Sequence, residues 1–130
     1  MKNINLLSAT LKTNALFSLI SGVLLIVLHQ YWQQVFEVEF PFYAIGIGIL
    51  LFAWYVFKIA RQDPIPIKEA RPIILMDALW VLMSVVVLFT NESISATGNW
   101  LIGIVAALVA DFAIFQYLGI KNLLRSADTI

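Results

Sequence analysis

The amino-acid sequence predicts an all-α integral membrane protein with four transmembrane helices. Of the 130 residues, 62% are hydrophobic and only 12% are charged, whereas soluble domains average about half apolar and about a quarter charged residues. The apolar residues also come in long blocks, close to the ~20 residues that a helix needs to cross the hydrocarbon core. A soluble four-helix bundle would need a polar face on each helix, and these blocks have none.

Composition also limits the chemistry that the chain can carry. The formal net charge is zero, so no basic field indicates binding to nucleic acid. The chain has no Cys, which excludes disulfides, thiolate metal sites and thiol redox chemistry. A single His rules out a metal site built from several histidines. We therefore expect no metal and no cofactor.

The first half of the chain predicts two spans joined by an aromatic segment. A short polar lead, residues 1–12, precedes the first span at residues 13–28. Residues 31–42 are rich in aromatic side chains, which favour the headgroup layer, so we expect this segment to lie at the membrane interface with one short helix. Pro41 then sets the entry to the second span, at residues 43–60.

The second half predicts a hinge and two further spans. Three prolines in and just after a linker at residues 62–71 prevent a continuous helix. The last of them, Pro72, suits the N-terminal position of the third span, residues 73–89. A polar loop at residues 90–99 leads to the fourth span, residues 100–120.

The distribution of cationic side chains predicts the orientation. All eight Lys and Arg belong to the N-terminal lead, the end of the second span, the linker or the C-terminal tail: Lys2, Lys12, Lys58, Arg61, Lys68, Arg71, Lys121 and Arg125. The other two loops carry only acidic charges. Under the positive-inside rule, both termini and the linker face the cytoplasm. The expected location is the plasma membrane, taken as the inner membrane of a bacterium.

The two halves resemble each other. Residues 14–25 align with 77–88 at six identities, and residues 45–57 align with 102–114 at five. Because self-similarity is informative about architecture, we expect one membrane domain, residues 1–130, made of two tandem two-helix hairpins, at about 11–61 and 72–122. A pseudo-two-fold axis along the membrane normal would relate them. The expected packing is a left-handed bundle held through small residues.

Polar residues inside the spans are the candidate site. Asn14 in the first span corresponds to Asp77 in the third, and Trp80 lies one turn after Asp77. Asp111 is central in the fourth span and has Trp54 as its repeat partner, so the indole N–H would donate to the carboxylate. An acid at a helix centre costs about 2.5–3.5 kcal/mol on insertion scales, and such residues usually have a function.

Asp77 has an alternative interpretation, since it lies near the cytoplasmic end of its span. It would then pair with Lys58, Lys12 or Arg71 and only stabilise the helices, because long basic side chains reach towards the interface.

Three classes of function remain open. The first is a structural or partner-binding subunit that docks another membrane protein or a second copy through a flat face of Gly103, Ala107 and Ala110 on the fourth span. The second is a small-molecule or lipid-binding protein, or a dimeric transporter, with a polar pocket lined by Asn14, Trp54, Asp77, Trp80 and Asp111. The third is an intramembrane enzyme with two aspartates. No catalytic motif accompanies these aspartates, so we expect a non-enzymatic partner subunit embedded in the bilayer.

Overall fold

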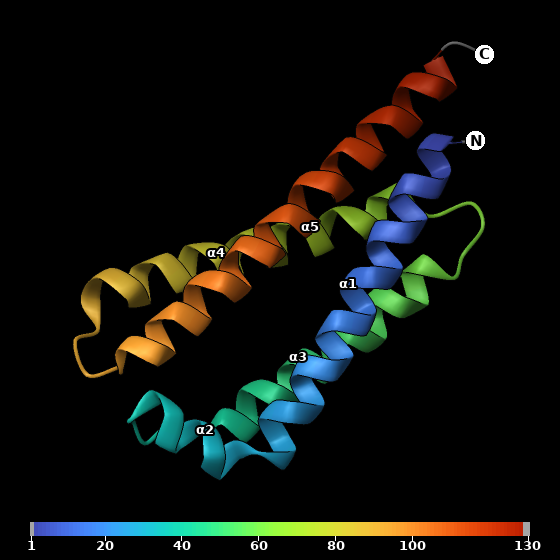
Figure 1. Cartoon of the computed structure of the whole chain (residues 1–130). Coiled ribbons are helices and arrows are strands. Elements are labelled where there is room, and N and C mark those ends of the chain that lie inside the picture. The colour runs from blue at the N-terminus through green and yellow to red at the C-terminus, as the bar shows by residue number, and fades with distance from the viewer. Residues whose placement is uncertain (1, 129–130) are drawn as a thin grey trace.

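The computed structural model describes residues 2–128, and the chain forms five α-helices (Figure 1). Four are long and one is short. Their bounds are α1 Lys2–Val27, α2 His29–Phe36, α3 Phe42–Ala60, α4 Ile67–Thr90 and α5 Ala96–Asp128.

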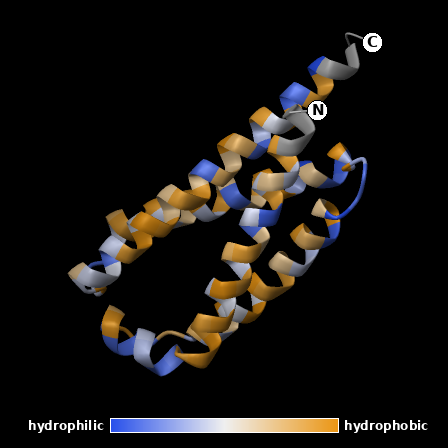
Figure 2. Cartoon of the chain, turned by 45° about the vertical axis from the view of Figure 1, so that its right-hand side comes forward, coloured by the Kyte–Doolittle hydropathy of each residue, from blue (hydrophilic) through white to orange (hydrophobic). Residues whose placement is uncertain are grey.

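The four long helices have the length and the apolar composition that the sequence predicted for membrane spans. In the described residues, each contains a segment long and apolar enough to cross a membrane: Leu6–Val27, Phe42–Ala60, Ile67–Thr90 and Ala96–Arg125. Hydrophobic residues cover all sides of these segments rather than a single stripe (Figure 2). Most of that apolar surface is exposed, because only about a sixth to a third of each span is buried within the chain. Lipid is therefore the solvent that suits this surface.

Two glycines bring α1 and α3 into close contact. A Cβ atom added to Gly46 would lie 2.8 Å from the carbonyl oxygen of Gly22, and a Cβ on Gly22 would lie 2.8 Å from the Leu50 side chain. There is no room for a larger residue at either position. Small residues of this kind let helix backbones approach closely in membranes, so α1 and α3 form one tightly packed hairpin.

The second hairpin, α4 with α5, joins the first at its two ends (Figure 1). At the end with the chain termini, α5 packs on α1, where Gly119 lies against the backbone of Leu7. At the opposite end, Ser95 beside the start of α5 donates through its hydroxyl to the carbonyl of Val35, at 2.6 Å. Gly98 there lies against the ring of Phe36. The hairpins are thus held together at two separate levels.

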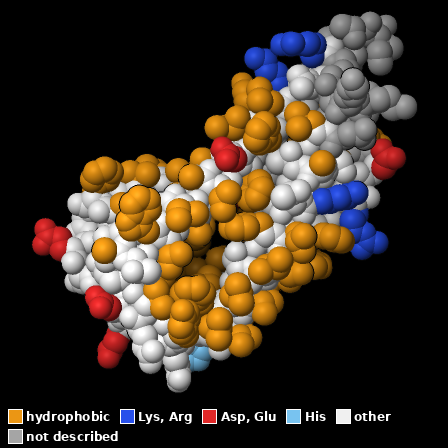
Figure 3. Space-filling view, in the orientation of Figure 1, with side chains coloured by type: hydrophobic (Ala, Val, Ile, Leu, Met, Phe, Trp, Pro, Cys, Tyr) orange, Lys and Arg blue, Asp and Glu red, His pale blue; other side chains and the backbone are white. Residues whose placement is uncertain are grey.

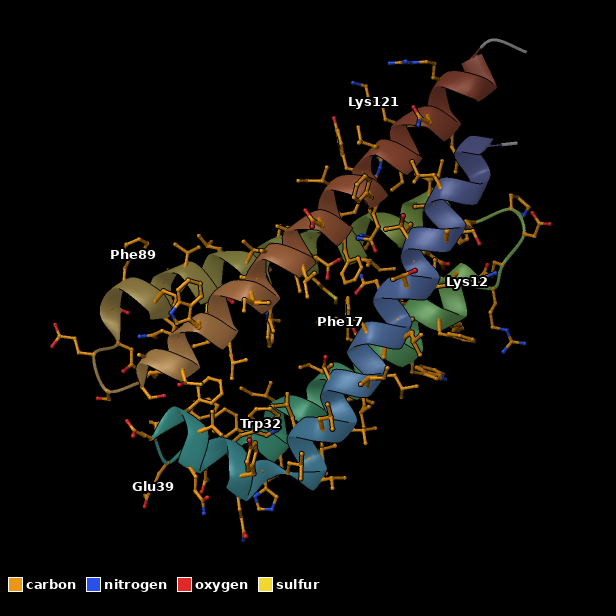
Figure 4. The ribbon with its side chains drawn as sticks, in the orientation of Figure 1. Lys12, Phe17, Trp32, Glu39, Phe89 and Lys121 are labelled. Carbon is orange, nitrogen blue, oxygen red and sulfur yellow. The ribbon has the colours of Figure 1, made fainter. Side chains whose placement is uncertain are left out.

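A hollow lined by hydrophobic side chains lies between the two hairpins (Figure 3). It has the Phe17 side of α1 on one flank (Figure 4). The Phe17 ring meets the Phe112 ring of α5, with centroids 5.6 Å apart. The packed core lies beyond this pair, towards the termini. It is built from buried residues of α1, α3, α4, α5 and the linker, among them Leu11, Val56 and Ile73.

Several predicted boundaries were wrong. The third span starts at Ile67 rather than residue 73, so Pro72 lies inside α4. Inside a helix proline removes one backbone hydrogen bond, and its ring crowds the carbonyl four residues earlier. α4 nevertheless continues through Pro72, so the linker is shorter than predicted. The fourth span begins at Ala96 and continues to Asp128, past the expected residue 120. A short helix, α2, forms in this part of the chain as expected.

Charged side chains separate towards opposite ends of the molecule. Lys and Arg gather on the part that carries the termini and the α3–α4 connection, where acidic side chains also lie, whereas the charged side chains at the far end are acidic (Figure 3). Figure 4 shows the same separation, with Lys12 and Lys121 in the upper part and Glu39 below. The chain thus has one cationic end and one anionic end, separated by apolar helices.

Candidate functional site

Three buried polar side chains from three helices form one hydrogen-bonded cluster. Asn14 of α1 donates from Nδ2 to Asp77 Oδ2 of α4 and to Gln116 Oε1 of α5, both at 2.9 Å. Gln116 in turn donates from Nε2 to the same Asp77 oxygen, at 2.9 Å. The three side chains are at most 3% exposed. We call Asn14, Asp77 and Gln116 the polar cluster.

The polar cluster is buried, and side chains of neighbouring helices supply its hydrogen bonds. The two amide groups already occupy Oδ2 of Asp77, and Ser18 one turn along α1 donates to Asn14 Oδ1 at 3.4 Å. Phe17 and Phe112 pack beside it. A buried polar group is stable only when its hydrogen bonds are made, and here neighbouring helices supply the donors. The arrangement therefore connects α1, α4 and α5.

Sequence reasoning missed Gln116, although a signal was present. Gln116 interrupts an apolar block and follows Phe112 by four positions, on the same face of α5. Asp77 was expected to meet a cation, as one alternative, but its donors in the structure are two amides. The amides of Asn14 and Gln116 lie at the depth of Asp77, whereas Lys12 is exposed.

The two tryptophans of the predicted pocket lie away from the polar cluster. Trp54 is 66% exposed on α3, and the ammonium group of Lys58 lies 5.4 Å from its ring centre. Trp80 is 37% exposed, and its backbone carbonyl accepts from Ser84 Oγ at 2.8 Å. Asn14 and Asp77 are the predicted residues that the structure brings together.

Asp111 also lies outside the polar cluster. Its side chain is exposed, on the face of α5 opposite the buried residues Val109 and Gln116. The expected contact with Trp54 is not made, because α3 and α5 do not pack against each other. The structure thus puts a carboxyl group on the outer surface, near the middle of the 30-residue apolar segment of α5.

A stripe of exposed residues surrounds Asp111. It follows the i, i+4, i+7 spacing of one helix face and consists of Trp100, Ile104, Ala107, Asp111, Ile114 and Leu118. This spacing is typical of a seam that packs against another helix. We call this set the α5 stripe. Its residues are exposed, whereas α5 meets α1 through Phe112, Gln116 and Gly119, which lie outside the stripe.

Small residues leave a groove beside the N-terminal half of the α5 stripe. An open groove of about 540 Å³ is lined by Ala96, Asn99, Trp100, Gly103, Ile104 and Ala107. A Cβ atom on Gly103 would meet nothing within 4 Å. Asn99 Oδ1 is buried in this region, and no donor among the described residues reaches it. The groove is thus an open depression along one face of α5.

Nothing in the described residues resembles a metal site, since no three His, Asp or Glu side chains are grouped closely enough to hold an ion. Comparison of the chain with protein-family models, with curated proteins and with solved structures finds no match. The features of the structure that bear on function are therefore the polar cluster, the α5 stripe and the groove.

Proposed function

We propose that this chain is a partner-binding subunit of a membrane assembly, without catalytic activity of its own, and that it docks its partner along the α5 stripe. The observation that carries this proposal is the exposed carboxyl group of Asp111 in the middle of a membrane-spanning helix. A charged or strongly polar group at this depth faces protein or water rather than lipid tails. A partner helix that packs on α5 would supply that protein environment.

The polar cluster supports a structural role for the interior. Its members satisfy one another, with three hydrogen bonds of 2.9 Å, so the polar groups inside the chain are used to hold helices together. The remaining intramembrane acid is then the one on the outside. This division separates a fixed scaffold from a surface available for docking.

We further propose that the chain lies in a plasma membrane, the inner membrane of a bacterium, with both termini and the α3–α4 connection in the cytoplasm. The gathering of cationic side chains at one end supports this orientation. The two anionic loops would face the exterior.

The tandem repeat remains part of the proposal. Asn14 and Asp77 are equivalent positions of the two halves and are hydrogen-bonded to each other, as residues beside a two-fold axis would be. The packing departs from that symmetry, because α1 and α5 are in extensive contact whereas α3 and α4 meet only near their connection. An ancestral duplication whose halves have since diverged is consistent with both observations.

Position-specific cross-linking tests the proposed docking. Because the chain has no Cys, single-Cys variants can carry a photoactivatable cross-linker at Trp100, Ile104 or Ala107. In native membranes we expect all three positions to give one protein adduct of the same mass. Control positions on other exposed faces, Leu51 and Leu75, should give none.

A second, matched pair of variants makes the cross-linking test specific. Gly103 and Gly48 both have open space where a Cβ would be placed, but only Gly103 lines the groove. We expect Gly103→Leu to abolish the adduct and Gly48→Leu to leave it. Equal adducts at all positions, or none on α5, would contradict the proposal.

The hollow between the hairpins favours a second candidate, the binding of a lipid or another apolar small molecule (Figure 3). Its hydrophobic lining suits an acyl chain better than a charged ligand. A further single-Cys variant at Phe17 with the same cross-linker distinguishes the two candidates. Lipid binding in the hollow predicts lipid adducts near Phe17 and no protein adduct along the α5 stripe.

A further inference from the structure

The depth of Asp111 restricts what can cover it. Asp111 lies ten positions before Lys121, about 15 Å along the helix axis at 1.5 Å per residue. On α1, the amide of Asn14 meets Gln116, so Lys12 lies near the level of residue 118. That level is about 10 Å from Asp111. Within this chain, then, the nearest cations lie well above the carboxyl group.

A second copy of the chain cannot supply a cation at this level. All eight Lys and Arg lie towards the ends of the spans or outside them. A parallel copy would bring its own Asp111 to the same depth, and an antiparallel copy would bring its cations to the opposite end. Long basic side chains also extend towards the interface rather than towards the bilayer centre. Charge complementarity therefore favours a different protein over a homodimer.

The shape of the α5 stripe agrees with one further helix as the occupant. Its exposed residues repeat at i, i+4 and i+7, and Gly103 and Ala107 allow a partner backbone to approach closely. Trp100, 74% exposed at one end of the groove, offers a large aromatic face.

We infer that the occupant of the α5 stripe is a membrane-spanning helix of another protein, which carries a Lys or Arg at mid-span that pairs with Asp111. This inference rests on the proposed partner-binding function and adds the chemistry of the partner. In hydrocarbon such an ion pair is strengthened by the low dielectric constant, and it neutralises two groups that are each unfavourable alone.

Synthetic transmembrane peptides test the inference with the full-length chain. One Leu/Ala peptide carries a single Lys at its midpoint, and the matched peptide carries Leu there. Binding is measured in phosphatidylcholine vesicles by energy transfer from a donor dye on the single thiol of Glu92→Cys to an acceptor on the peptide. We expect the Lys peptide to bind at least tenfold more tightly than the Leu peptide.

Variants of the chain locate the effect. Asp111→Asn should remove the preference for the Lys peptide, whereas Glu37→Gln, in an exposed loop, should keep it. Gly103→Leu should weaken binding of both peptides, and Gly48→Leu should weaken neither. All variants are first shown to have unchanged helicity by circular dichroism, so that a lost preference is not a folding defect.

Three outcomes would overturn the inference. Equal binding of the two peptides would show that no cation is recognised, and a preference that survives Asp111→Asn would put the recognition elsewhere. Self-association of the unmodified chain that excludes the Lys peptide would identify a second copy as the occupant. Cross-linking in native membranes tests partner binding separately. If the protein adduct persists in Asp111→Asn, the partner-binding function is supported and only the pairing of Asp111 with a cation is contradicted.

Discussion

At the scale of single residues, the polar cluster shows what a span-only sequence reveals and what it hides. Asn14 and Asp77 were identifiable as a pair because they interrupt matching apolar segments. The repeat did not point to the third member, Gln116, because its counterpart in the first half is the apolar Ile59. The interruption of an apolar block was the signal that remained. The exposure of Asp111 could not be predicted either, because the helices that pack against α5 determine which of its faces is buried.

Asp77 gives the prediction at this scale. Asp77→Leu removes the acceptor that Asn14 and Gln116 share, so we expect it to lower the free energy of unfolding by about 1–2 kcal/mol, between the values for soluble and membrane hydrogen bonds. Asp77→Asn keeps an acceptor oxygen, and its loss should stay below about 1 kcal/mol. Reversible unfolding in mixed detergent micelles measures both.

Asp111→Leu is the matched control, because it removes an acid at an exposed position without hydrogen-bond donors among the described residues. It should not lower stability. If Asp77→Leu had the same free energy of unfolding as the unmodified chain, the polar cluster would not contribute to stability.

At the scale of helices, close approach is set by a few small residues. The sequence predicted packing through small residues, and the close contact of α1 with α3 is made by two of them, Gly22 and Gly46. The predicted start of α4 was wrong because of Pro72. From sequence alone, a proline in the second turn of a helix cannot be distinguished from a proline at the helix start. The pairing of α1 with α3 follows from their short connection, whereas the choice of α1 as the helix that meets α5 required the structure.

Gly46 and Gly48 give a matched prediction on one helix. Gly46→Ala places a Cβ atom 2.8 Å from the backbone of Gly22, so α1 and α3 must move apart. We expect a loss of about 1–3 kcal/mol, the usual range for overpacking. Gly48→Ala meets open space and should cause no loss. The same unfolding measurement checks both, and an equal response would mean that the close contact at Gly22 does not hold the hairpin.

At the scale of the whole molecule, composition was the most informative feature. Apolar blocks of the length of a bilayer predicted four spanning helices, and the structure has them. The compact four-helix bundle was less well predicted, because the two hairpins touch at their ends and leave a hollow between them (Figures 1 and 3). Hydropathy cannot distinguish a surface that faces lipid from one that faces a hollow, since both are apolar.

Orientation is the prediction that belongs to this scale. Lys and Arg resist translocation, so the end that carries them should stay inside. With no native Cys, Asp63→Cys in the α3–α4 connection and Glu92→Cys in the α4–α5 connection each provide one thiol. In intact cells a membrane-impermeant maleimide should label Glu92→Cys and should reach Asp63→Cys only after the membrane is opened.

The reverse labelling pattern would mean that the orientation is opposite, with the cationic end outside. Labelling of both thiols in intact cells would contradict the spanning of α4 itself, because that helix alone separates the two positions. The proposed docking along α5 requires the expected labelling pattern, because only a spanning α5 keeps Asp111 at the depth where its carboxyl group needs a partner.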